Sequence, residues 1–197
     1  MTDVEVVTAF LQAQADKELS LELSRQEVAR GQGTERNLIR ICGLSGEATI
    51  PLCDRSPQQS EQTQKAALHA AVACDGFLML IVTSAISIAG EVDKPRVIEA
   101  LRKGQPLSAG LETETGIVVY GSGAWGRLAV LLRPGGERVN VSENIDDNNQ
   151  VFGWVRNFWE KVDAEIGSQS GDGAQGVHGA LGVLLAEAAD IKRGTLH

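Results

Sequence analysis

The chain has 197 residues, of which 43% are hydrophobic, so it is long enough to close one substantial core without requiring a second domain. The formal net charge of -8 at pH 7 argues against two partners, a nucleic-acid backbone and an anionic membrane surface, because each would be repelled on average.

A helix is predicted at the N-terminus. Thr2 stands three residues before Glu5, which is a capping-box pattern that places the first helical residue at about Asp3. A narrow apolar stripe follows, made of Val6, Val7, Phe10 and Leu11. The later residues are mostly polar, so the segment is either two helices or one long arm ending near Gly31 to Gly33. We expect residues 1–34 to form a helical arm that packs on the chain's own core more readily than on a partner.

A β-hairpin is predicted next. Residues 38–43 and 48–53 flank a loop at residues 44–47, and antiparallel pairing sets Ile41 opposite Ile50 and Ile39 opposite Leu52. The second strand holds Pro51, which cannot donate to a ladder and therefore favours an edge strand. Arg40, Cys42, Thr49 and Pro51 share the other face.

The following helix has a clear start. Ser56 supplies an N-cap, Pro57 a first-turn proline and Gln59 the capping-box side chain, and the helix is predicted to run to about Cys74.

The longest apolar stretch of the chain is residues 66–89, which has the length of a membrane span. Against a single span, Asp75 would lie inside the bilayer at a cost of a few kcal/mol. Asp75-Gly76 is instead a turn dipeptide, and the continuously apolar residues 77–82 are typical of a strand covered on both faces. We therefore predict a helix, a turn at Asp75 and a buried strand, with the membrane span as the alternative.

The second half of the sequence predicts one short helix and then a meander of strands. The helix begins at Asp93 or Lys94 and ends near Gly104. Strands follow at residues 116–120, 127–132 and 137–141, with a turn at residues 133–136 that sets Val130 opposite Val139.

An amphipathic helix at residues 151–166 should cover this sheet. Residues 167–179, rich in Gly, Ser, Gln and Asp, predict a flexible linker, and residues 180–191 a last helix. The expected fold class is α+β: one mixed sheet with an antiparallel C-terminal meander, covered by helices, in a core domain at residues 35–166. The helical arm before it and residues 167–197 after it are appendages.

A glycine-rich string follows the apolar strand that ends at Tyr120. Gly121, Gly123 and Gly126 match G-x-G-x-x-G, and with Trp125 the string resembles the fingerprint of Rossmann dehydrogenases, particularly the GxGxWG form of glycerol-3-phosphate dehydrogenases. The resemblance implies that the glycines admit a pyrophosphate and that residues 127–132 form a helix pointing its N-terminus at the charge. The competing interpretation, which we favour, is a glycine-rich hairpin loop.

A second candidate ligand site is the loop expected at residues 83–91. It offers Thr83, Ser84, Ser87 and Glu91 at the carboxyl end of a central strand, where α/β sheets place small-molecule ligands. The order of Asp75, apolar strand, hydroxyl-rich loop and helix resembles TIR-like and nucleoside-processing α/β folds. The acid that this resemblance implies on the helix is unassigned, since Arg96 occupies one register and Glu99 another.

No catalytic set emerges from the sequence. The three histidines, His69, His178 and His197, are scattered, so no metal site is predicted and no cofactor is expected. The three cysteines lack CxxC spacing and no basic segment followed by an apolar run opens the chain, which favours a cytoplasmic protein with reduced thiols. We expect a non-catalytic interaction or assembly module that binds a protein partner or itself. A small nucleotide-binding domain or enzyme is the alternative.

Overall fold

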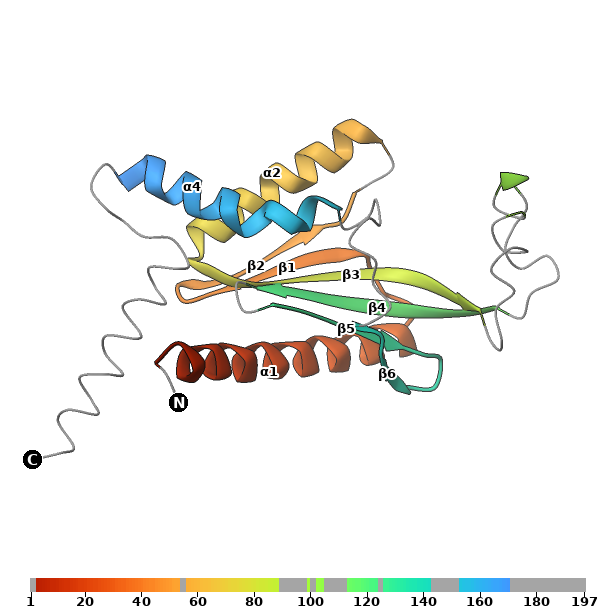
Figure 1. Ribbon diagram of the computed structural model, residues 1–197. Coiled ribbons are helices and arrows are strands. Elements are labelled where there is room, and N and C mark those ends of the chain that lie inside the picture. Colours follow the sequence, from red (N-terminus) through yellow and green to blue (C-terminus); the bar gives the residue numbers. More distant parts are fainter. Residues whose placement is uncertain are drawn as a thin grey trace, which may run out of the picture.

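The computed structural model describes residues 3–53, 56–88, 99, 102–104, 113–123, 126–142 and 153–170. Its centre is a six-stranded sheet in the order β2-β1-β3-β4-β5-β6. Helix α1 covers one face, and helices α2 and α4 cover the other (Figure 1). The elements are α1 (Asp3–Gly31), β1 (Leu38–Gly43), β2 (Gly46–Pro51), α2 (Pro57–Ala73), β3 (Gly76–Ile88), β4 (Thr113–Gly123), β5 (Gly126–Leu132), β6 (Arg138–Asn140), the short 3-10 helix η2 (Gly153–Asn157) and α4 (Phe158–Ser170).

The fold is therefore α+β, as the sequence predicts, and the N-terminal helix, expected as an arm outside the core, forms one of two helical layers that enclose the sheet. All five strand pairings among the described residues are antiparallel, whereas a mixed sheet was expected. The difference arises at β3. Helix α2 connects β2 to β3 on the other side of β1, and β3 pairs with β1 in the antiparallel direction.

The long apolar stretch is broken where the sequence predicts. Helix α2 ends at Ala73, Asp75 has a φ of 50°, and β3 begins at Gly76. Aspartate is one of the few residues that adopts this left-handed conformation readily, and the Ser45 hydroxyl donates a hydrogen bond to its carboxylate. No helix in the part of the chain that the structure describes is long and apolar enough to cross a membrane.

Strand β3 is buried on both faces. Leu78, Leu80 and Val82 pack on the side of α1, whereas Met79 and Ile81 pack on the side of α2 and α4. Double burial removes the usual alternation of polar and apolar residues, which explains the continuous apolar run. The strand extends to Ile88, beyond the predicted residues 77–82, because β4 pairs with it from Leu78 to Ile88.

The β1–β2 hairpin forms with its faces as expected and its register shifted. Ile39 lies opposite Ile50, so the predicted pairing of Ile41 with Ile50 is wrong by two residues. The turn is tighter than predicted, since Gly43 already pairs with Gly46. A shift of two leaves every side chain on its predicted face. Strand β2, which contains Pro51, is an edge strand of the sheet, as predicted.

The meander of β4, β5 and β6 is also confirmed, but its second turn is misplaced by one residue. Leu131, not Val130, lies opposite Val139. The turn closes with the Arg133 amide donating to the Glu137 carbonyl at 2.8 Å, which fixes this register. A shift of one residue moves Val139 to the opposite face from the one predicted.

The start of α2 follows its sequence signal, whereas the single helix predicted at residues 151–166 is instead the 3-10 helix η2 followed by α4. Ser56 Oγ accepts a hydrogen bond from the Gln59 amide at 3.2 Å, so the predicted N-cap of α2 is confirmed. In α4, Trp159 is buried and its Nε1 donates to Ser122 Oγ on β4 at 3.3 Å. The predicted linker at residues 167–179 is wrong for residues 167–170, because α4 continues to Ser170. The rest of the linker, the last helix and most of the helix at residues 93–104 lie outside the described residues.

Candidate functional site

The glycine-rich string lies in a hairpin. Gly121 and Gly123 are on β4, Gly126 begins β5, and Gly123 pairs with Gly126. Residues 127–132 form a strand, so the helix N-terminus that the dinucleotide resemblance requires is not present at this position. Gly121 has a packing role instead, because a Cβ there would lie 3.0 Å from the Leu128 side chain.

The hydroxyl residues of the second candidate site lie on a strand and not in a loop. Thr83, Ser84 and Ser87 belong to β3, and Glu91 lies outside the described residues. Successive side chains of a strand point to opposite faces, so Ser84 faces away from Thr83. Ser84 donates from its amide to Asn37 Oδ1 at 3.0 Å, which ties this strand to the segment before β1. In an antiparallel sheet, neighbouring strands do not end at the same edge, so the ligand position of parallel α/β sheets does not arise here.

Helix α1 packs on the sheet along one stripe of its surface. The buried apolar residues of this stripe recur every four positions: Leu11, Ala15, Leu19 and Leu23. Ala15, Leu19 and Leu23 join the core cluster that contains Leu80 and Val119. The helix therefore docks on its own chain, which is the outcome that the sequence favours. Phe10, expected in the packed stripe beside Leu11, is exposed.

A buried charge cluster lies beside this stripe. Glu22 is 0% exposed, and its carboxylate accepts hydrogen bonds from Arg40 Nε on β1 and from Gln26 Nε2, each at 2.7 Å. Arg25 approaches the same carboxylate at 3.5 Å. Because a buried carboxylate needs these donors, the cluster fixes the position of α1 along β1. Nothing in the sequence pattern identified it.

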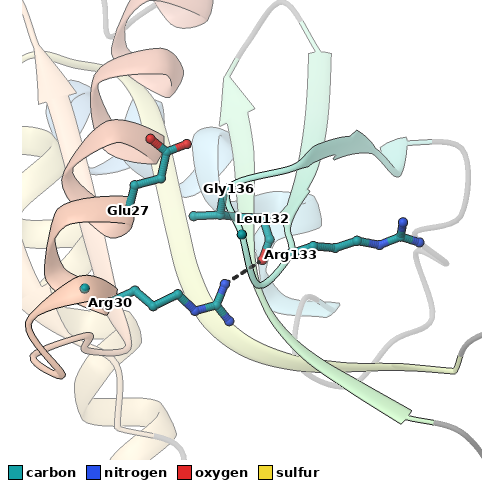
Figure 2. Close-up of a pocket in the computed structure, with 7 residues that line it drawn as sticks. Glu27, Arg30, Leu132, Arg133 and Gly136 are labelled. Carbon is teal, nitrogen blue, oxygen red and sulfur yellow. Dashed lines mark hydrogen bonds between the residues drawn. The ribbon is translucent and has the colours of Figure 1, made fainter.

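A pocket of about 380 Å³ lies where the end of α1 meets the β5–β6 turn (Figure 2). Arg30 donates to the carbonyls of Leu132 at 3.3 Å and of Thr115 at 2.9 Å, and Arg138 pairs with Glu27 at 3.0 Å. Figure 2 shows the Arg133 side chain directed away from Arg30. The pocket carries mixed charge without converging catalytic groups, and its polar contacts join α1 to the sheet.

Three of the four large apolar side chains exposed among the described residues lie on the outer side of α1, and the fourth, Leu44, lies in the β1–β2 turn. Phe10 is 51% exposed, Leu21 43% and Val28 61%. They are separated by 11 and 7 residues, which brings them within about 20° of one line on a helix of 3.6 residues per turn. This line, which we call the outer stripe, is on the opposite side from the packed stripe, and α1 is the outermost layer on its side of the sheet (Figure 1). The 7- and 11-residue spacing was readable in the sequence, but it was overlooked.

The described residues offer little reactive chemistry. They contain no group of three or more His, Cys, Asp or Glu side chains arranged to hold a metal ion. Burial, reinforced by the nearby carboxylates of Glu18 and Glu47, raises the pKa of the Cys42 thiol to about 12, so this buried thiol stays protonated and a poor nucleophile at neutral pH.

Comparisons of this chain with models of protein families, with curated proteins and with solved structures found no match.

Proposed function

We propose that this chain is a non-catalytic assembly module that associates with a second copy of itself through the outer stripe of α1. The observation that carries the proposal is the exposure of Phe10, Leu21 and Val28 on one line of a helix whose other side is already packed. A helix that is apolar on opposite sides gains stability when both sides are covered. The three side chains lie about 16 and 10 Å apart along one line of the helix, and this alignment supports an extended interaction surface.

The outer stripe is also nearly free of charge. The positions that complete it at three- and four-residue spacing are Gln14, Lys17 and Ser24, so Lys17 is its single charged residue. The chain as a whole carries a formal charge of -8, which repels a second copy. A face that lacks acidic residues is where two copies can approach with the least repulsion.

The stripe is complementary to itself when a second copy runs in the opposite direction. A two-fold axis near residue 19 sets Phe10 opposite Val28 and Gln14 opposite Ser24 of the other copy. Lys17 then lies opposite Leu21, which its aliphatic stem can cover while the ammonium stays in water. Phe10 and Val28 meet as apolar groups, Gln14 and Ser24 meet as polar groups, and each contact occurs twice, as in an isologous interface.

Contacts with the sheet fix α1 in place before any association. Its 29 residues span about 43 Å, and the buried Glu22 cluster and the contacts of Arg30 fix it to the sheet at separate points. A surface that is rigid before association loses less conformational entropy when it binds. As part of the same proposal, we place the protein in the cytoplasm, where its free cysteines would stay reduced.

Leu21→Glu tests the proposal against a matched control, Gln12→Glu. Both add one negative charge at an exposed position of α1, but residue 12 lies nine positions away and half a turn off the outer stripe. Sedimentation velocity over a concentration series should show at least tenfold weaker dimerisation for Leu21→Glu and no change for Gln12→Glu. Equal behaviour of both variants and the unsubstituted protein would refute association through this face.

A further inference from the structure

A second surface feature lies on the opposite side of the sheet. A groove of about 240 Å³ separates α2 from the η2–α4 segment, and its apolar lining is Leu68, Trp154 and Phe158. The rings of Trp154 and Phe158 meet edge to face with centroids 5.6 Å apart, and Phe158 is buried, so this aromatic part of the groove is packed against the core. Leu68 and Trp154 are only half-buried.

The rim of the groove carries a cation that lacks a carboxylate partner among the described residues. Lys65 pairs with Glu61 at 2.7 Å, but Lys161 on the other side has no described carboxylate within salt-bridge distance. An occupant that is apolar on one side and acidic beside it would match both the floor and Lys161.

The chain itself contains such a segment. The sequence predicts a helix at residues 180–191, and Leu181, Leu184, Leu185 and Ala188 recur at the i, i+3, i+4 and i+7 spacing with which amphipathic helices enter grooves. Glu187 lies outside this apolar face, about 60° around the helix from Leu184.

The connection is long enough for the segment to return. From the groove at Phe158 to the end of α4 at Ser170 is about 18 Å along the helix. The nine residues 171–179 reach about 30 Å when extended, so residues 180–191 can run back along α4 to the groove. The outer stripe of α1 lies on the other face of the sheet and is a less direct destination.

We propose that residues 180–191 dock as a helix into the groove between α2 and α4 of the same chain. Leu184 and Leu185 contact Leu68 and Trp154, and Glu187 approaches Lys161. The interaction is independent of self-association through α1, since the two surfaces lie on opposite faces of the sheet.

Hydrogen–deuterium exchange of the full-length chain tests this docking. The backbone amides of residues 180–191 should exchange at least tenfold more slowly than an unstructured peptide of the same sequence. Gln64→Trp, which fills the groove from its rim, should abolish that protection, whereas Gln62→Trp, on the exposed side of the same helix, should leave it intact. Leu184→Asp should abolish it without altering the folded core.

Three results would overturn the docking. The first is unprotected exchange of residues 180–191 in the unsubstituted protein. The second is protection that survives both Gln64→Trp and Leu184→Asp, which would assign the segment to another surface. The third is protection that disappears on dilution, which would assign it to another copy of the chain. If Gln64→Trp lowers the melting temperature, its loss of protection cannot be assigned to the groove, and Leu184→Asp becomes the test of the docking. Leu184→Asp should also increase exchange in α2 around Leu68, because the docked segment would no longer cover that residue.

Discussion

Arg40 on β1 donates a hydrogen bond of 2.7 Å from Nε to the Glu22 carboxylate on α1, and Glu22 is fully buried. The two residues lie 18 positions apart in the sequence and belong to different layers of the fold. Removing one partner of such a pair leaves the other charge buried and unpaired. This lowers the free energy of unfolding by far more than the intact pair contributes to it.

Arg40→Met should therefore lower the free energy of unfolding by about 3–5 kcal/mol. The double variant Glu22→Met with Arg40→Met should recover most of this loss, because no buried charge remains. Urea unfolding of the three proteins measures both effects. Glu47→Gln is the control, since Glu47 is exposed and lies 3.5 Å from Arg40, and its expected effect is below about 1 kcal/mol. A double variant no more stable than Arg40→Met would contradict this account of the cluster.

Gly43 should not tolerate a side chain. A Cβ at this position would lie 1.9 Å from the carbonyl oxygen of Cys74, so Gly43→Ala must displace either the β1–β2 turn or the end of α2. We expect a loss of about 1–3 kcal/mol in thermal or urea unfolding. Gly31→Ala is the matched control, because no atom lies within 4 Å of its added methyl group, and it should be neutral or slightly stabilising. Equal stability of the two variants would contradict the close approach at Gly43.

Cys42 should be protected from alkylation in the folded protein. Burial, then the carboxylates of Glu18 and Glu47, raises its pKa from 9.0 to about 12, whereas Cys53 is exposed. Peptide mass spectrometry after iodoacetamide treatment at pH 8 should find Cys53 modified and Cys42 unmodified until urea is added. Rapid modification of Cys42 without urea would contradict its burial.

The same raised pKa predicts a pH dependence with a definite sign. Between pH 9 and about 12 the folded protein keeps the Cys42 proton and the unfolded chain loses it. The contribution to stability is therefore complete below pH 9 and is lost as the pH rises toward 12. Unfolding free energy should fall more steeply in this window for the unsubstituted protein than for Cys42→Ala, and parallel curves would exclude the effect.

Turn, capping and proline signals, each carried by a few neighbouring residues, made much of the fold predictable from the sequence. Asp75-Gly76 can leave a helix because both residues accept unusual backbone angles, Ser56 and Pro57 begin a helix by capping, and Pro51 favours an edge strand. Each of these signals acts within a few residues, so no tertiary contact is needed to interpret it.

Strand register and the buried charge were not predictable in the same way. The register depends on how tightly each turn closes, which Gly43 and Gly46 decide in one hairpin and Arg133 with Glu137 in the other. A glutamate in a helix favours a solvent-facing assignment, and the burial of Glu22 follows only from its contact with a distant strand. The candidate ligand residues Thr83 and Ser84 were misplaced because β4 extends β3 past the point where its apolar run ends.

The molar mass of the full-length protein in solution tests the central claim most directly. Light scattering on a size-exclusion column, over a range of loading concentrations, should report a mass of about twice 20.9 kDa at high concentration and should fall toward one chain for Leu21→Glu. A constant mass of one chain at every concentration would contradict self-association through the outer stripe of α1.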